Sequence, residues 1–352
     1  MLGNIRSEFI LREIFELIKK KNCLNLVNHN KKLQKRLKLS LDDYIFFKQI
    51  ELEIIPIKEI NDGENIFINT FSNASFYHIY FNNDKNEINR NYITKEDNVT
   101  KIKVLIDKEV ESFSELFQDC ICIKEIKFIK CYRTNIIEMS NMFDGCESIN
   151  KIDISNLKTD NTSTMRNMFG NCKSLEELDL SNFKTTNVVN MAHMFHGCEK
   201  LKKLDISKFK TKNVINMSYM FCKCSSLELL DISSFETDNV VDMGYLFCDC
   251  SLLKELDVTG FKTDKVTNMH YMFYKCQSLE ELNVSNFATE NVVDVCGIFF
   301  GCTMLKNLDL TNFKNKDGTQ KDNMFHEFPP RLNIMALTEA LMVGGPLEDI
   351  FE

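Results

Sequence analysis

Apolar and polar positions repeat along most of this chain with a fixed period of 26 residues. Phenylalanine occurs at every twenty-sixth position from Phe117 to Phe325, and a cysteine follows three residues after each of these phenylalanines except the last. No insertion interrupts the series. Such regularity is typical of a solenoid, in which no unit buries its apolar face alone and each stacks on its neighbours. The sequence therefore predicts one elongated repeat array with a continuous core.

The unit between Cys172 and Cys198 shows which elements the pattern predicts. Its first half contains three leucines in the order of a leucine-rich repeat, and the spacing of Leu178 and Leu180 places both on one face of a short strand. Its second half has five apolar residues at the spacing of one helix face: Val188, Met191, Met194, Phe195 and Cys198. We therefore expect an α/β fold, a leucine-rich-repeat-like β/α solenoid of 26-residue repeats.

Patterning outside the array predicts three further segments. Residues 1–50 have helical spacing and form a small helical head, whereas residues 51–110 alternate as in strands and form a small β-rich unit. The solenoid then occupies residues 111–328, and residues 329–352 form a C-terminal cap. In this cap Pro329 and Pro330 are expected to stop the array before a short helix.

Composition and charge indicate which kinds of partner and which cellular compartment to expect. The chain has 352 residues, 44% of them apolar, and a net charge of −8, which disfavours nucleic acid or an anionic membrane as partner. No apolar run is long enough to span a membrane, and the first residues do not resemble a secretory signal. We therefore expect a cytoplasmic protein whose 14 cysteines are reduced and serve as small apolar core residues.

Two pairs of cysteines on adjacent repeats could supply four thiols to zinc: Cys222 with Cys224, and Cys248 with Cys250. Since Cys224 and Cys250 belong to the column that faces the core, we favour packing and predict neither a metal nor a cofactor. The sequence contains no phosphate-binding loop, metalloprotease motif or nucleophile elbow. We therefore predict that the protein is not an enzyme.

An acidic column lies between the two core residues of each strand and should face outward on the strand side. Carboxylates on strands about 4.8 Å apart repel one another. Either hydrogen bonds from neighbouring hydroxyls and turn amides offset this repulsion, or the column binds a basic partner or a cation. Position 203 varies between repeats while its neighbours do not, as expected of specific contacts. The candidate partner-binding residues are Asp153, Asp179, Asp205, Asp231, Asp257, Asp309, Lys203, Leu229 and Glu255.

The array resembles the BspA-type leucine-rich repeat, also described as a domain of unknown function in mycoplasma lipoproteins. The pattern NVxxMxxMFxxCxSLxxLDxSxFxT stands here as NVINMSYMFCKCSSLELLDISSFET, starting at Asn213. This resemblance implies a solenoid that binds other macromolecules and has no catalytic residues. Bacterial members are often attached to the cell surface, so a surface adhesin is one alternative function.

The head, over residues 9–37, resembles an F-box in the order of its features. Four apolar residues match the first F-box helix and would bind a Skp-type adaptor: Leu11, Ile14, Phe15 and Ile18. The resemblance implies a substrate-recognition subunit of a ubiquitin ligase, whereas the alternative is an amphipathic cap on the first repeat. Our preferred function is a protein-interaction scaffold that binds an unidentified protein partner on its repeat surface.

Overall fold

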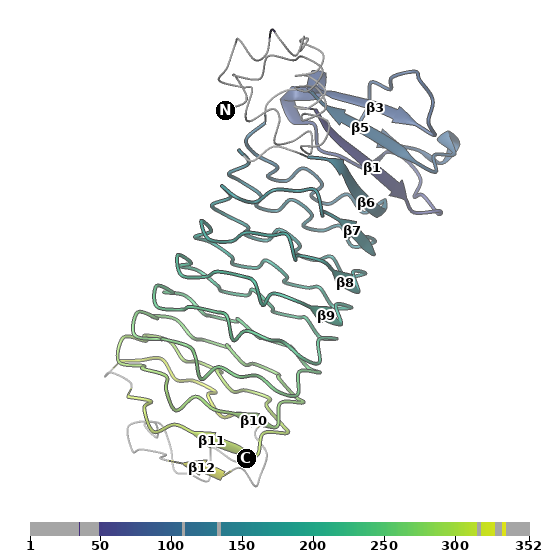
Figure 1. The fold of residues 1–352 in the computed structure, drawn as a ribbon. Coiled ribbons are helices and arrows are strands. Elements are labelled where there is room, and N and C mark those ends of the chain that lie inside the picture. The colour runs from purple at the N-terminus through teal and green to yellow at the C-terminus, as the bar shows by residue number, and fades with distance from the viewer. Residues whose placement is uncertain are drawn as a thin grey trace.

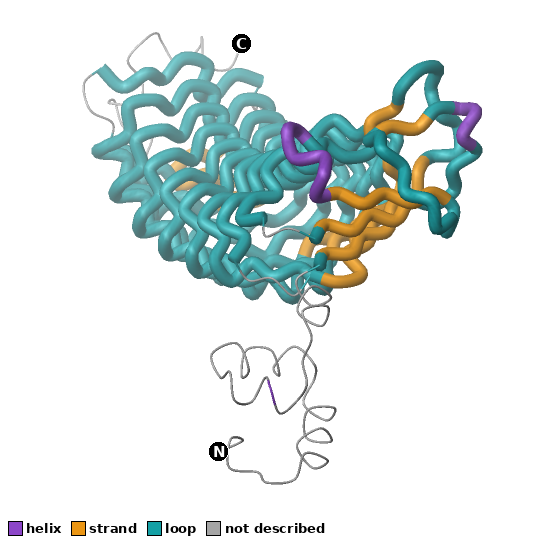
Figure 2. Tube along the Cα trace, turned by 90° about the horizontal axis from the view of Figure 1, so that it is seen from above, coloured by secondary structure: helices purple, strands orange, loops and turns teal. Residues whose placement is uncertain are grey.

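The computed structural model describes residues 49–107, 110–131, 135–314, 318–327 and 333–335, together with Lys35. Within this part, 26-residue turns of chain, here called rungs, stack into an elongated array, and a strand-rich unit lies at its N-terminal end (Figure 1). Seen from above, successive rungs overlap with a progressive offset, and the strands of the N-terminal unit gather at one side (Figure 2). The predicted head lies almost wholly outside the described residues.

A five-stranded sheet joins the N-terminal unit to the array. Strand β1 pairs antiparallel with both β5 and β6, and β6 pairs in parallel with β7, so the order is β3-β5-β1-β6-β7. Alternate residues of β1 are buried, as its sequence pattern predicts. The strands are β1 (Ile50–Pro56), β3 (Tyr77–Phe81), β5 (Ile102–Ile106), β6 (Ile123–Lys130) and β7 (Lys151–Asp153). The β-rich unit therefore continues the sheet of the solenoid and covers its first edge.

Short elements complete this unit. Strands β2 (Asn65–Ile66) and β4 (Tyr92–Ile93) form an antiparallel pair. Two 3₁₀ helices accompany them, η2 (Phe71–Phe76) and η3 (Lys95–Asp97). A capping box between Thr94 and Asp97 fixes the start of η3.

Parallel pairing with a constant shift of 26 residues builds the array. Glu177 pairs with Lys203, and Asn307 pairs with Asn333. The strands are β8 (Glu177–Leu178), β9 (Lys203–Leu204), β10 (Glu281–Leu282), β11 (Asn307–Asp309) and β12 (Asn333–Met335). Because β12 keeps the register of the repeat, the array continues beyond Pro329 and Pro330, where we expected it to stop.

The helix predicted in each unit is wrong. Residues 110–131, 135–314 and 318–327 contain no α-helix. The segment from Met191 to Cys198 instead forms two consecutive four-residue turns, in which Met194 N–H donates to Met191 C=O at 3.2 Å and Cys198 N–H donates to Phe195 C=O at 3.1 Å. The third residue of each turn is left-handed, with φ of 59° at His193 and 72° at Gly197. The solenoid therefore consists of short strands and turns.

Hydrogen bonds between rungs replace those of the predicted helix. Met191 N–H donates to Asn216 C=O at 3.0 Å, and Phe195 N–H donates to Met220 C=O at 2.9 Å. Each rung thus bonds to the next along its turns as well as along its strands. Buried backbone groups need such partners, and stacking supplies them without a helix.

One phenylalanine and one cysteine from each rung form the centre of the core. Successive rings from Phe117 to Phe325 stack with centroids 5.3–6.2 Å apart. The Cys198 thiol donates to Phe169 C=O at 3.1 Å, and the other cysteines from Cys146 to Cys302 in this column donate in the same way at 3.0–3.3 Å.

Within the described part of the chain no helix is long and apolar enough to cross a membrane.

Candidate functional site

The acidic column on the strand side is engaged in the turns of its own rungs. Asp205 Oδ1 accepts hydrogen bonds from the backbone N–H and the hydroxyl of Ser207, at 3.0 and 2.7 Å. These bonds, the one from the hydroxyl most of all, lower the pKa of the Asp205 carboxyl. The same backbone bond occurs in the other members: Asp153, Asp179, Asp231, Asp257 and Asp309. The first of the two alternatives for this column is therefore observed, and binding of a basic partner there stays a prediction.

The variable position on the same side is exposed in each of its three candidate members: Lys203, Leu229 and Glu255. Leu229 keeps 65% of its surface exposed, and its rung bridges in parallel to that of Glu255. The structure thus brings these residues together with the acidic column along one face. Their role in binding also stays a prediction, as does that of the head residues Leu11, Ile14, Phe15 and Ile18, which lie outside the described residues.

The four cysteines considered for zinc do not form one cluster. Cys224 and Cys250 direct their thiols at the carbonyls of Phe195 and Phe221, at 3.2 and 3.1 Å. No group of three or more His, Cys, Asp or Glu side chains in the described residues is placed to hold a metal ion. Burial raises the pKa of the column thiols, to about 12 at Cys198, so they stay protonated and act as weak hydrogen-bond donors.

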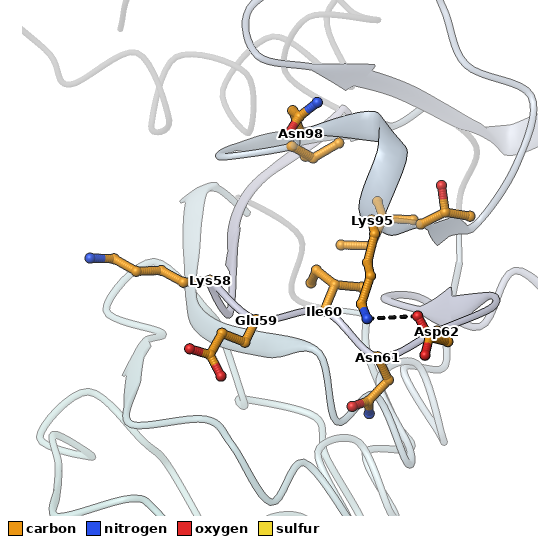
Figure 3. A pocket seen from close by; sticks show the side chains of 10 residues that line it. Lys58, Glu59, Ile60, Asn61, Asp62, Lys95 and Asn98 are labelled. Atoms are coloured by element: carbon orange, nitrogen blue, oxygen red, sulfur yellow. Dashed lines mark hydrogen bonds and ion pairs between the residues drawn. The ribbon is translucent and has the colours of Figure 1, made fainter.

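A polar cavity of about 590 Å³ lies in the N-terminal unit, between the segment from Lys58 to Asp62 and the turn that carries η3 (Figure 3). Lys95 Nζ reaches across it to Asp62 Oδ1 at 2.6 Å. This ion pair neutralises the two charges that face each other there. The cavity brings together no nucleophile and base, and we assign it no chemistry.

An aromatic surface that the sequence pattern did not predict lies on the turn side of the array. Seven rings follow one another there in continuous contact, with centroids 4.3–5.3 Å apart. Six of them are half-buried, and the seventh, His326, is exposed. We call this surface the aromatic run; its members are His193, Tyr219, Tyr245, Tyr271, Tyr274, Phe300 and His326.

Three tyrosines of the aromatic run have left-handed backbone. The φ angles of Tyr219, Tyr245 and Tyr271 are 58°, 56° and 53°. Asparagine or glycine occupies the same position in other rungs, as at Asn167 and Gly297. Bulky residues rarely adopt this conformation, which asparagine and glycine tolerate. The tyrosines are therefore not the residues that the backbone itself favours.

Gly297 accommodates the end of the tyrosine stack. A Cβ atom at this position would lie 2.4 Å from Cε1 of Tyr271, so the Tyr271 ring lies directly against the glycine backbone. Gly297 itself has a φ of 55°. The run then continues through Tyr274, whose ring contacts Tyr271 edge to face at 5.3 Å.

Burial keeps His193, Tyr219 and Tyr245 of the aromatic run uncharged near neutral pH. Burial raises the pKa of Tyr219, and burial together with the neighbouring tyrosines raises the pKa of Tyr245. Burial lowers the pKa of His193 to about 4, so its ring is neutral. His196, beside it, also has a lowered pKa, and its Nδ1 is the one buried side-chain nitrogen or oxygen without a hydrogen-bond partner among the described residues.

The sequence does not single out this surface, although three of its tyrosines share one position of the repeat. Reading one position down the repeats gives asparagine at Asn141 and Asn167, then His193, then three tyrosines in a row. The members of this position are neither uniformly apolar, as in the core columns, nor uniformly charged, as in the acidic column. Its tyrosines therefore do not stand out from hydrophobic periodicity or from charge.

Comparison with known proteins places the chain in a family. The family model described as a mycoplasma protein of unknown function, DUF285, matches residues 77–203, 111–230, 172–256 and 216–333, together well over half of the chain. The chain belongs to the DUF285 family. The overlap of the four matches is as expected for a DUF285 protein built from repeats.

One solved structure similar to this DUF285 protein is a leucine-rich repeat protein from Bacteroides ovatus ATCC 8483. The two are 17% identical, with a TM-score of 0.38, and the match covers 69% of the DUF285 chain. The chain spans 58% of the length of that protein. No curated protein matches the sequence.

Proposed function

We propose that this DUF285 protein is a non-enzymatic scaffold that binds a protein partner, and that the aromatic run is its binding surface. The observation that carries this proposal is the aromatic run itself, with tyrosine at three left-handed positions. Tyrosine and other aromatic residues are enriched at the centres of protein interfaces and among the residues that dominate their binding energy. A run across adjacent rungs offers such residues in a fixed geometry.

Energetics argue that these tyrosines serve something other than folding. A left-handed conformation costs a bulky residue about 1–2 kcal/mol, and stacking on a neighbour returns about 0.5–1.5 kcal/mol beyond what half-burial of the ring contributes. The core beneath is already closed by the fully buried column that contains Phe221 and Phe247. Asparagine would suit the backbone better at Tyr219, Tyr245 and Tyr271, so the rings are best accounted for by contact with a partner.

The strand side is the second face of the same scaffold. Its acidic column already bonds to its own turns. Leu229 offers an isolated apolar contact in a variable column. The BspA-type resemblance supports binding of macromolecules in general. Adaptor binding stays a prediction, because it concerns the head, which lies outside the described residues. The adhesin alternative and the cytoplasmic location also stay predictions.

Replacement of the three tyrosines by asparagine tests the proposal. The variant carries Tyr219→Asn, Tyr245→Asn and Tyr271→Asn, which keep a residue type that the left-handed backbone accepts. We expect unchanged circular dichroism and loss of the partner in affinity capture from the native cell, followed by mass spectrometry.

A matched control changes the strand side instead. Asp205→Asn and Asp231→Asn copy Asn283, which occupies the acidic column in its own rung and makes the same turn bonds. This variant should retain the partner. If the tyrosine variant captures the partner as well as the wild type does, or if only the aspartate variant loses it, the aromatic run is not the binding surface.

A further inference from the structure

Cys222 and Cys248 occupy the same position in adjacent rungs, outside the buried thiol column. Both are buried on the turn side, with 2% and 6% of their area exposed. The backbone holds the two rungs in register, because Lys223 N–H donates to Cys248 C=O at 2.7 Å and Phe221 N–H donates to Leu246 C=O at 3.0 Å. The two side chains are therefore neighbours by construction.

Flanking side chains show that the pair points the same way. The rings of Tyr219 and Tyr245, three residues before the cysteines, stack with centroids 4.3 Å apart. The rings of Phe221 and Phe247, one residue before the cysteines, stack with centroids 5.7 Å apart. Rungs that pair as parallel strands lie about 4.8 Å apart. This spacing falls within the range of Cα separations, about 4.4–6.8 Å, that a disulfide bridges.

The thiols of the buried column also lie on adjacent rungs, but they are occupied differently. Cys224 and Cys250 donate to phenylalanine carbonyls one rung back and are fully buried. Cys222 and Cys248 contact each other instead, and this contact is the main cause that raises the pKa of Cys248.

We propose that Cys222 and Cys248 form an oxidisable dithiol whose oxidant is a low-molecular-weight disulfide such as oxidised glutathione. One protein thiolate attacks a glutathione sulfur, forms a mixed disulfide and releases one glutathione thiolate. The second protein thiolate then attacks the protein sulfur of the mixed disulfide, forms the Cys222–Cys248 bond and releases the other glutathione thiolate. The protein loses two protons and two electrons, and oxidised glutathione takes up both to become two glutathione molecules.

The bond would tie two rungs together directly beneath the stacked rings of Tyr219 and Tyr245. It closes a loop of one repeat and so restricts separation of these rungs. This site stands independently of the proposed binding function, because it depends only on the positions and surroundings of the two thiols.

Oxidation of the native, full-length protein tests the proposal. The protein is incubated with excess oxidised glutathione, free thiols are then alkylated, and the digest is analysed by mass spectrometry. We expect a peptide pair linked through Cys222 and Cys248, two hydrogens lighter than the reduced pair and cleaved by dithiothreitol. The linked pair should be absent from Cys222→Ser and Cys248→Ser variants whose circular dichroism matches the wild type.

Cys296, half-buried and the most accessible cysteine among the described residues, provides the matched control. The Cys296→Ser variant should form the Cys222–Cys248 link as the wild type does, and glutathione attached to Cys296 in the wild type shows that the oxidant is active. Three results would overturn the proposal: the pair stays reduced while Cys296 reacts, glutathione stays attached to Cys222 or Cys248 without ring closure, or Cys224 and Cys250 link to the same extent.

Discussion

His193 is a titratable side chain held in an aromatic stack. Its ring lies 4.4 Å from that of Tyr219, and burial lowers its pKa to about 4, whereas histidine in an unfolded chain titrates near 6.5. Between these values the unfolded chain binds more protons than the folded protein. The free energy of unfolding should therefore fall as pH is lowered from about 6.5 towards 4, and His196, whose pKa is also lowered, acts in the same direction.

Replacing His193→Asn isolates this contribution. Asparagine occupies the same left-handed position at Asn167, so the backbone should not change. Denaturant unfolding at pH 7 and pH 5 should show a loss of stability that is about 1 kcal/mol larger for the wild type than for the variant, a figure reduced for solvent screening of the half-exposed ring. Equal losses in the two proteins would mean that His193 titrates normally in the folded state.

At the scale of the element, a buried threonine joins each rung to the next. Thr185 Oγ1 donates to Lys210 C=O at 3.0 Å and accepts from Lys210 N–H at 2.7 Å. Equivalent donor bonds hold from Thr159 to Thr263, and these side chains are buried. One hydroxyl thus satisfies both backbone groups of a residue in the neighbouring rung, at a bend where no strand ladder reaches them.

Thr185→Val and Thr185→Ser test this role. Valine keeps the shape but leaves the backbone N–H and C=O of Lys210 without their partner in Thr185, at about 1–3 kcal/mol for each group that stays out of water. Serine keeps the hydroxyl and loses one methyl group. Unfolding in urea should therefore rank the proteins wild type, serine variant, valine variant, in order of decreasing stability. A valine variant as stable as the serine variant would show that water or a relaxed backbone satisfies Lys210.

The elements also show what the sequence could and could not predict. The apolar core positions of the unit were predicted, because apolar side chains repeat wherever the solenoid faces inward, whereas the buried Thr185 was not expected in the core. The helix was not, because Met191, Met194, Phe195 and Cys198 occupy the first and fourth positions of two consecutive turns, a spacing that also fits one face of a helix. The distinguishing signal lies at the third position of each turn, where residues that accept positive φ recur: Asn141, Gly145, Asn167, Asn171, Gly197 and Gly301.

The candidate sites were harder to predict than the core. Outward positions of a repeat carry no common type, so neither periodicity nor composition separates a binding surface from an ordinary one. The acidic column drew attention by its charge, yet its serine and threonine partners two residues later already account for it. The aromatic run becomes visible only when stacking between rungs places Tyr219 against Tyr245 and Tyr271.

For the whole molecule, stability should be close to a sum over rungs, since each rung contacts mainly its two neighbours. Exposed ion pairs also join only neighbouring rungs: Lys202 pairs with Glu176 at 2.8 Å, and Lys254 pairs with Glu228 at 2.9 Å. The N-terminal sheet closes one end by turning from parallel to antiparallel pairing at β6. Such an architecture should accept a change in the number of rungs more readily than a change in their length.

Deletion of one period, residues 201–226, is the sharpest test of this view. Leu227 then takes the place of Leu201, every core column keeps its register, and unfolding in urea should remain cooperative, with the denaturant slope reduced by roughly a tenth in proportion to the surface lost. Glu176 would then lie beside Glu228 instead of Lys202, and this repulsion should cost under about 1 kcal/mol because both side chains are exposed.

Deletion of residues 201–213 removes half a period and places Phe221 13 residues after Phe195, so that its ring meets a bend instead of the stack. We expect this shorter deletion to abolish the cooperative transition although it removes fewer residues, and a cooperative half-period variant would refute the rung as the unit of stability.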